Sequence, residues 1–223
     1  MKNKEERSLV LQSAVDKGAL SPQDLIEYKT GQKIFQSEEL FIRKKLSGTA
    51  GVIEFINEND VQKNCVTNIS KGYVPSESNI IVDKIGMRFG YSSVDVAPEL
   101  VSYSNAIFSI DDLNFDAGAV ATGDSVVARR IPIQIENAEY ELKVDSILMD
   151  SGRVAELLSH NVSIDGVSGY EKNLKELEWP KLFLSGKKIT LNLKFPENGT
   201  VPVGFYYAEL VCKGLGLGKR QGK

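Results

Sequence analysis

The single histidine of this sequence, His160, is the first candidate for a catalytic residue. Ser159, Ser163 and Asp165 lie nearby and could supply the partners of a Ser-His-Asp triad. Adjacent residues of an extended strand point to opposite faces, however, and no nucleophile-elbow motif surrounds either serine. We therefore interpret His160 as a loop histidine and predict no catalytic residue and no enzymatic activity.

Metal and carboxylate chemistry would need residues that are far apart in the chain. One histidine and two distant cysteines, Cys65 and Cys212, do not make a usual zinc site. We expect both thiols to be reduced and buried, with a single disulfide as the alternative. The aspartates could pair as glycosidase carboxylates or bind Ca²⁺, but the Asp-x-Asp-x-Asp-Gly spacing is absent. We interpret them as solvated turn residues and expect no metal and no cofactor, with an incidental Ca²⁺ site as the alternative. The aspartates concerned are Asp111, Asp112, Asp116, Asp145, Asp150 and Asp165.

The glycine-rich run from Lys213 to Arg220 superficially resembles a phosphate-binding loop. A P-loop needs Gly-x-x-x-x-Gly-Lys-Ser/Thr before a helix, and here the first glycine is displaced and Arg220 replaces Ser/Thr. We interpret residues 218–223 as a flexible basic tail that could contact nucleic acid or a neighbouring subunit through charge.

Aromatic residues cluster late in the sequence and could form a sugar-binding platform. Aromatic side chains in strands more often pack in a core, which is the interpretation we favour. The residues concerned are Trp179, Phe205, Tyr206 and Tyr207. The basic runs Arg43-Lys44-Lys45 and Arg129-Arg130 are interpreted as solvated edges.

The composition describes an ordinary globular chain of 223 residues with 42% hydrophobic and 26% charged residues. The net charge of −3 gives no overall basic field that would attract nucleic acid. No apolar run approaches the roughly 20 residues of a spanning helix. The start, Met1 to Arg7, is too charged to lead into a signal peptide, so we expect folding in a cytoplasm.

Two regimes of periodicity follow one another along the chain. Residues 1–47 are predicted to be helical, because Leu9, Val10, Ala14 and Val15 recur at helical spacing. Ser21-Pro22-Gln23-Asp24 has the composition of a helix start. A further short helix is predicted to begin at Ser37-Glu38-Glu39 and to end at Arg43-Lys44-Lys45, where cations suit the helix dipole.

From about residue 50 the hydrophobic period changes to two, which is typical of half-buried strands. About eight to ten strands with little helix between them predict an antiparallel sandwich or jelly roll, since parallel sheets need crossover helices. Residues 152–159 could form one or two helical turns. The strand candidates are 52–56, 65–69, 85–91, 101–110, 125–129, 131–135, 140–144, 189–195 and 205–211.

A loose pattern of strands and turns covers about half of the chain. Its segments are Ala50-Gly-Val-Ile-Glu-Phe-Ile-Asn-Glu-Asn-Asp60, Val66-Thr-Asn-Ile69, Gly72-Tyr-Val-Pro75, Ile80-Ile-Val-Asp-Lys-Ile-Gly-Met-Arg-Phe-Gly90, Leu184-Ser-Gly-Lys-Lys-Ile-Thr-Leu-Asn-Leu-Lys-Phe-Pro196 and Gly204-Phe-Tyr-Tyr-Ala-Glu-Leu-Val-Cys-Lys-Gly214. The pattern resembles the jelly-roll capsid proteins of small tailless bacteriophages.

This resemblance implies a mainly β fold with a helical N-terminal arm (1–47), a jelly-roll β-sandwich (48–217) and a basic tail (218–223). A double jelly roll needs more residues, so a single jelly roll fits better. It also implies a structural virion protein, a capsid subunit that forms homo-oligomers by self-assembly. Its partners would be copies of itself and other virion proteins, with local nucleic-acid contact through the basic termini.

The residues expected to mediate assembly belong to the arm and the tail, because neither is needed to complete the sandwich core. They are Leu9, Leu25, Ile26, Phe35, Lys219 and Arg220. One alternative is a carbohydrate- or receptor-binding module of a fibre or baseplate, which would expose Trp179, Tyr206 and Tyr170. The other is a glycoside hydrolase on the same scaffold, which would need two converging acids, one with a raised pKa.

Overall fold

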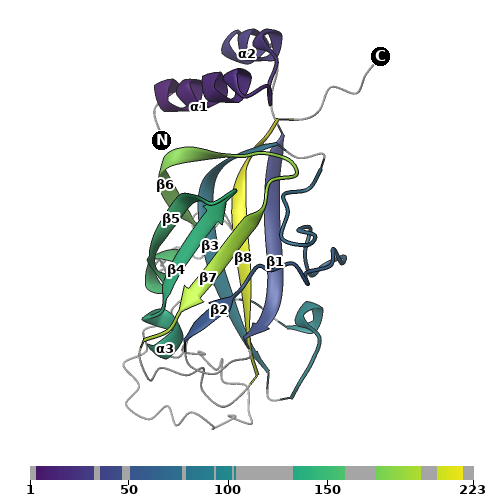
Figure 1. Ribbon diagram of the computed structural model, residues 1–223, viewed down its shortest axis with the longest axis vertical. Coiled ribbons are helices and arrows are strands. Elements are labelled where there is room, and N and C mark those ends of the chain that lie inside the picture. Colours follow the sequence, from purple (N-terminus) through teal and green to yellow (C-terminus); the bar gives the residue numbers. More distant parts are fainter. Residues whose placement is uncertain are drawn as a thin grey trace, which may run out of the picture.

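The computed structural model describes nine parts of the chain and shows a mainly β fold (Figure 1). These parts are residues 4–32, 36–46, 51–76, 79–92, 94–101, 103, 133–158, 174–196 and 205–217. Within them, two antiparallel sheets of four strands each account for most of the regular structure.

Each sheet combines strands from distant parts of the sequence. The first has the order β1-β8-β3-β6 and the second the order β2-β7-β4-β5. The first sheet consists of β1 (Ser37–Leu46), β8 (Phe205–Gly216), β3 (Ile80–Ser92) and β6 (Lys175–Phe183). The second consists of β2 (Val52–Glu54), β7 (Ile189–Lys194), β4 (Glu139–Val144) and β5 (Ile147–Arg153).

The pairing follows one simple rule among the described strands. The first strand pairs with the eighth, the second with the seventh, the third with the sixth and the fourth with the fifth. These are the rungs of one long antiparallel hairpin, whose closing turn is Asp145-Ser146. Both turn residues have positive φ (52° and 68°), as a two-residue primed turn requires. The additional pairs β3–β8 and β4–β7 divide this hairpin into two sheets.

One apolar core lies between the two sheets, as in a β-sandwich. Alternate residues of each strand point into it: Ile85 and Met87 on β3, and Leu191 and Leu193 on β7, are all fully buried. The strong period of two that the sequence shows over residues 85–91 and 189–195 therefore identified real strands, with the apolar residues inward.

Two helices precede the sheets and lie at one end of them (Figure 1): α1 (Lys4–Asp16) and α2 (Pro22–Lys29). The predicted helix start is confirmed, because Ser21 Oγ accepts a hydrogen bond from the Asp24 amide at 3.0 Å and the Asp24 carboxylate accepts one from the Ser21 amide at 3.3 Å. This reciprocal arrangement is a capping box.

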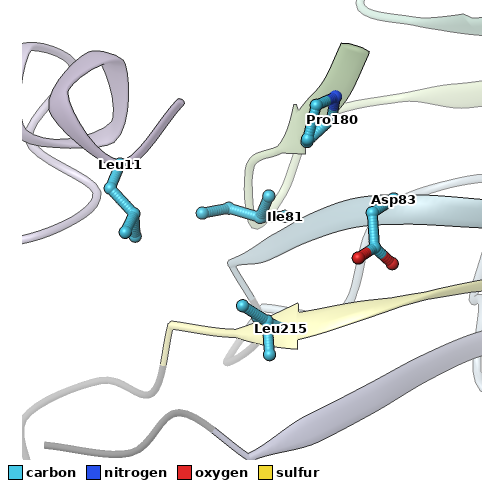
Figure 2. Close-up of a pocket in the computed structure, with 5 residues that line it drawn as sticks. All are labelled: Leu11, Ile81, Asp83, Pro180 and Leu215. Carbon is cyan, nitrogen blue, oxygen red and sulfur yellow. The ribbon is translucent and has the colours of Figure 1, made fainter. Parts of the chain in front are cut away.

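The helices pack on the outer face of the first sheet through an apolar cluster separate from the main core. Leu11 and Ala14 of α1 and Leu25 of α2 are buried there against Ile81 and Leu217. Figure 2 shows the small space left between α1 and the sheet, which Leu11, Ile81, Asp83, Pro180 and Leu215 line. At about 10 Å³ it has room for no more than a water molecule, so the helices are packed against their own chain.

The prediction of a helix over residues 37–45 was wrong, because these residues form strand β1. Leu40, Ile42 and Leu46 point inward and are buried, which gives the segment a period of two. The two sheets therefore begin at Ser37, and a boundary at residue 47 would separate β1 from its sheet.

Two further differences, and one agreement, concern short elements. Ile133–Glu136 forms the short helix α3 instead of a strand, and residues 65–69 contribute only isolated bridges. The helical turn expected within 152–159 is present as α4 (Val154–Leu157), and a single 3₁₀ turn, η1, covers Pro98–Leu100. The predicted strands 101–110 and 125–129 lie outside the described residues, apart from 101 and 103. None of the helices in the described ranges is long and apolar enough to span a bilayer.

Candidate functional site

A row of three charged side chains crosses the outer face of the first sheet. Arg43 on β1 and Arg88 on β3 both stand directly opposite Glu209 on β8. Arg43 Nε lies 2.7 Å from Glu209 Oε1, and Arg88 Nη1 lies 2.9 Å from Glu209 Oε2. Glu209 is 1% exposed and Arg88 7% exposed, so this is a buried ionic row on a face that points away from the core.

A segment that follows β3 lies over this row; we call residues 94–101 and 103 the strap. The Tyr207 hydroxyl, two positions from Glu209, is hydrogen bonded to the Val96 backbone, and Tyr103 lies 5.2 Å from the Arg43 guanidinium in a cation–π contact. Lys45–Asp95 (2.8 Å) and Lys63–Glu99 (2.5 Å) are ion pairs at the rim. The strap thus helps to explain why polar groups on an outer sheet face are buried.

The electrostatics of this face suit structural pairing better than proton transfer. Guanidinium groups stay charged at any physiological pH, so Arg43 and Arg88 cannot act as bases. Burial raises the pKa of Glu39, which lies near both arginines and near the like-charged Glu209. Removing one partner of a buried ion pair leaves the other charge buried and uncompensated, so disrupting such a row destabilises the fold.

A second polar cluster joins the two sheets at their β5 and β6 sides. Lys175 Nζ, at the start of β6, lies 2.8 Å from the Tyr140 hydroxyl, 3.0 Å from Asp150 Oδ2 and 3.1 Å from Glu156 Oε2. The Tyr140 hydroxyl in turn donates to Asp150 Oδ2 at 2.5 Å. Gly152 leaves space for this arrangement, because a Cβ at that position would lie 2.6 Å from Glu156 Oε2.

The protonation states of this second cluster argue against acid–base or nucleophilic chemistry. Burial, together with the hydrogen bond to Asp150, raises the pKa of Tyr140. Burial alone would lower the pKa of Lys175, but its bonds to Tyr140 and Asp150 outweigh that effect and raise it. A catalytic tyrosine or lysine needs a pKa moved toward neutrality, and both shifts go the other way. The cluster therefore acts as a polar tie between β6 and the opposite sheet.

The residues that the sequence suggested for catalysis or metal binding are only partly described. Asp145 pairs with Lys187 at 2.7 Å across the loop before β7, and Asp150 belongs to the polar tie. The two aspartates are therefore engaged with lysines rather than with each other. Across the described ranges, no group of three metal-ligating side chains occurs. The residues that lie outside these ranges are Asp111, Asp112, Asp116, Ser159, His160, Ser163 and Asp165.

The two cysteines have opposite environments, and neither forms a disulfide. Cys212 is fully buried, as expected, and burial raises the pKa of its thiol to about 12. The prediction that Cys65 is buried was wrong, because it is exposed in the loop between β2 and β3, where it has a φ of 63°.

The described aromatic residues do not gather on one face. Trp179 is 50% exposed on β6, whereas Tyr207 is fully buried on the outer face of β8. Tyr206, its neighbour in the strand, is half-buried and packs against the main core, and Phe205 lies beneath the Lys45 ammonium at 4.7 Å. Tyr170 lies outside the described residues.

The residues expected to mediate assembly divide into three groups. Leu9 on α1 and Ile26 on α2 are exposed, at 65% and 53%. Leu25 is buried within its own chain, so it stabilises the helix pair instead of offering a surface. Phe35, Lys219 and Arg220 lie outside the described residues.

Sequence reasoning missed the two polar clusters, although one signal for them exists. Glu209 is embedded in the run Tyr206-Tyr207-Ala208-Glu209-Leu210-Val211, and a lone charge in so apolar a strand indicates a buried partner. Arg88 alternates with apolar residues, a position that usually faces solvent, and only the register reveals its pairing with Glu209. No protein-family model, curated protein or solved structure matches this chain.

Proposed function

We propose that this protein is a structural virion protein, a capsid subunit with a single jelly-roll fold that assembles with copies of itself. It is made in a host cytoplasm and resides in the virus particle. Other virion proteins are its further partners, and its basic termini supply any contact with nucleic acid.

The observation that carries the proposal is the pairing of each strand with its mirror in the chain order. A long hairpin whose rungs join strands one to eight, two to seven, three to six and four to five is the arrangement expected of a jelly roll, and this supports the proposal. This architecture recurs in viral capsid proteins, lectins and cupins. The fold is therefore compatible with several functions, and the site must decide among them.

The chemistry of the described residues favours an assembly role over catalysis. The core between the sheets is filled with apolar side chains, and its largest buried residues include Phe55, Phe183 and Tyr140. The two polar clusters consist of paired charges, and in the second cluster the pKa values of Tyr140 and Lys175 are both raised, away from neutrality. A sandwich whose described polar clusters consist of paired charges suits a shell subunit.

The helix pair is the proposed assembly arm. Its inner face is occupied by its own sheet, while Leu9 and Ile26 point outward, so a neighbouring subunit could contact the arm without undocking it. The tail residues Lys219 and Arg220 would add charge-based contacts.

A glycan- or receptor-binding module is the second candidate, and Trp179 is the observation that favours it. An indole that is 50% exposed on β6 could stack on a sugar ring. The other candidate aromatics within the described residues face elsewhere, so in this part of the chain the function would rest on Trp179 alone.

The proposal is tested by the solution mass of the purified protein, measured by light scattering after size exclusion across protein concentration and salt. A second chain that begins at Gln36 removes both helices and leaves β1 in its sheet. We expect trimers, pentamers or larger species from the full chain and smaller species from the shortened one. A full-length chain that stays monomeric throughout, and that binds glycans in a Trp179-dependent way, would replace assembly with the second candidate.

A further inference from the structure

The edges of the two sheets decide where another strand could be added. An edge strand carries backbone N–H and C=O groups without a sheet partner, and proteins normally block such edges to prevent unwanted pairing. The strand orders give four edges here: β1 and β6 in the first sheet, β2 and β5 in the second.

The edge of β1 is blocked by the loop residues 66–68. The Arg43 amide donates to the Val66 carbonyl at 2.8 Å, and the Phe41 amide donates to the Asn68 side-chain oxygen at 2.9 Å. Asn68 Nδ2 donates to the Glu39 carbonyl at 2.7 Å. The outward backbone groups in the middle of β1 are therefore already used.

The edge of β6 is blocked in a different way, by a bulge. Residues Lys181 and Glu176 pair with Val82 and Lys84, so the four residues 177–180 stand opposite one residue of β3. Pro180 within this bulge has no amide hydrogen to offer. The edge of β2 is protected by its length, because that strand has only three residues.

The edge of β5 has only the mildest of these devices, a one-residue bulge, and it is neither shortened nor covered by a loop of the described residues. It has seven residues, contains no proline, and presents Ile147 (61% exposed) and Leu148 (49% exposed) to solvent. A one-residue bulge at Met149 interrupts its pairing with β4, but Asp150 to Arg153 continue the strand beyond it. Within the described ranges, no loop backbone is hydrogen bonded along its outer side.

We propose that β5 is the edge through which two copies of this chain pair, strand against strand, across a two-fold axis. Judged from the described residues, each copy brings the same open edge at β5 while its other edges are blocked, so edge-to-edge pairing would use β5 on both sides. Such an isologous contact closes on itself and does not propagate into a fibre. β5 carries one acidic and one basic residue, Asp150 and Arg153, so its net charge of zero does not repel a second copy. The inference rests on the proposed function in one respect, which is that the partner is a copy of the same chain.

The joined sheets would form one continuous eight-stranded sheet through the dimer. Backbone hydrogen bonds would supply the geometry, and the exposed side chains of Ile147 and Leu148 would supply apolar contact on its two faces. The polar tie of Asp150, Lys175 and Tyr140 joins β5 at Asp150 to β6, so the strand is held in an extended form before pairing.

The experiment compares the full chain with the double variant Ile147→Lys/Leu148→Lys by light scattering over a range of concentrations. Charges on an edge strand oppose pairing, and both positions are exposed, so the fold itself should tolerate the change. The matched control is Val61→Lys/Val94→Lys, which adds the same charge at exposed valines away from β5. We expect the β5 variant to lose the two-fold association, with at least a tenfold weaker dimer, and the control to keep it.

A second measurement identifies the contact directly. In a Cys65→Ser background, Ser151→Cys on β5 should give cross-linked dimers with a short bismaleimide, whereas Gln12→Cys on the exposed side of α1 should not. A β5 variant with unchanged mass, together with no Ser151→Cys cross-link, would overturn the β5 contact and leave the assembly function standing. A wild-type chain that is monomeric at every concentration would overturn both.

Discussion

The Tyr207 hydroxyl accepts a hydrogen bond from the Val96 amide at 3.0 Å and donates one to the Val96 carbonyl at 2.8 Å. The two residues are 111 positions apart in the chain, so this side chain pins the strap to the outer face of β8. The hydroxyl bonds the amide and the carbonyl of Val96, as the backbone of a neighbouring strand would. A single oxygen atom therefore satisfies both backbone groups of Val96.

Replacing Tyr207 by Phe should loosen the strap while the two sheets stay folded. The change removes both bonds to Val96, and leaving such groups without partners costs about 1–3 kcal/mol. We expect faster amide exchange at Val96 and its neighbours and a lower denaturation midpoint, measured by hydrogen–deuterium exchange and by urea titration. Tyr73→Phe is the control, because Tyr73 is 43% exposed. Unchanged exchange at Val96 would mean that other contacts fix the strap.

The helix pair offers a matched test of packing against exposure. Leu11 is fully buried against the first sheet, and Leu9, two residues away, is 65% exposed. Truncating a buried leucine to alanine costs about 2–5 kcal/mol, so Leu11→Ala should release α1 and α2 from the sheet. Limited proteolysis would then cut within residues 4–32 faster than in wild type, whereas Leu9→Ala should leave the cleavage rate unchanged.

Leu9→Ala has its own expected effect on assembly. If a neighbouring subunit covers Leu9, the variant should keep wild-type proteolysis and lose oligomer mass. If oligomer mass falls in Leu11→Ala but not in Leu9→Ala, the helix pair supports assembly by staying packed on the sheet, and Leu9 is not a contact residue.

The thiols should react in two distinct steps. Cys65 is exposed and should be modified at once by a thiol reagent in the native state. Cys212 is fully buried, and burial raises its pKa to about 12, so it has almost no thiolate at neutral pH and should react only on unfolding. Mass spectrometry after brief labelling should find one modified cysteine per chain. Rapid modification of Cys212 would show that β8 opens in the native state.

Glu39 should make the protein less stable as the pH rises above about its ordinary value of 4.5. Burial raises its pKa in the folded state, so the folded protein binds this proton more tightly than the unfolded chain does. The corresponding stability is present below the unfolded pKa and is lost as the pH rises through the folded pKa. Glu39→Gln should therefore raise the urea midpoint at pH 7, with a smaller effect at pH 4.

Glu176→Gln, which removes an exposed carboxylate from β6, controls for the change in net charge. A Glu39→Gln variant that is less stable than wild type at pH 7 would contradict this account. It would show that the carboxylate is stabilised by Arg43, Arg88 and Lys213 more than burial penalises it.

The elements that the sequence predicted well are those whose signals are local. The α2 start could be recognised because Ser21 and Asp24 cap the helix within four residues, and Ile189–Lys194 because its alternation is complete. β1 was mistaken for a helix because its charges suggested helix ends. Those charged side chains instead form ion pairs with residues outside the segment: Arg43 with Glu209, 166 residues away, and Lys44 with Asp60.

The two polar clusters could not be predicted either, because their partners are also far apart in the sequence. The row of Arg43, Glu209 and Arg88 exists only once β8 lies between β1 and β3, which no spacing along the chain specifies. β5 escaped prediction because it is an edge strand exposed on both faces, so its residues do not alternate between apolar and polar. In the proposed dimer, the strand that pairs is thus one that the sequence does not show.

Electron microscopy of the concentrated, purified protein would show whether the chain assembles. We expect closed particles or regular oligomers of uniform size, which become smaller or disappear in the Ile147→Lys/Leu148→Lys variant or when the helix pair is removed. A field of separate single chains, unchanged across concentration and salt, would contradict the claim that this protein functions by assembly.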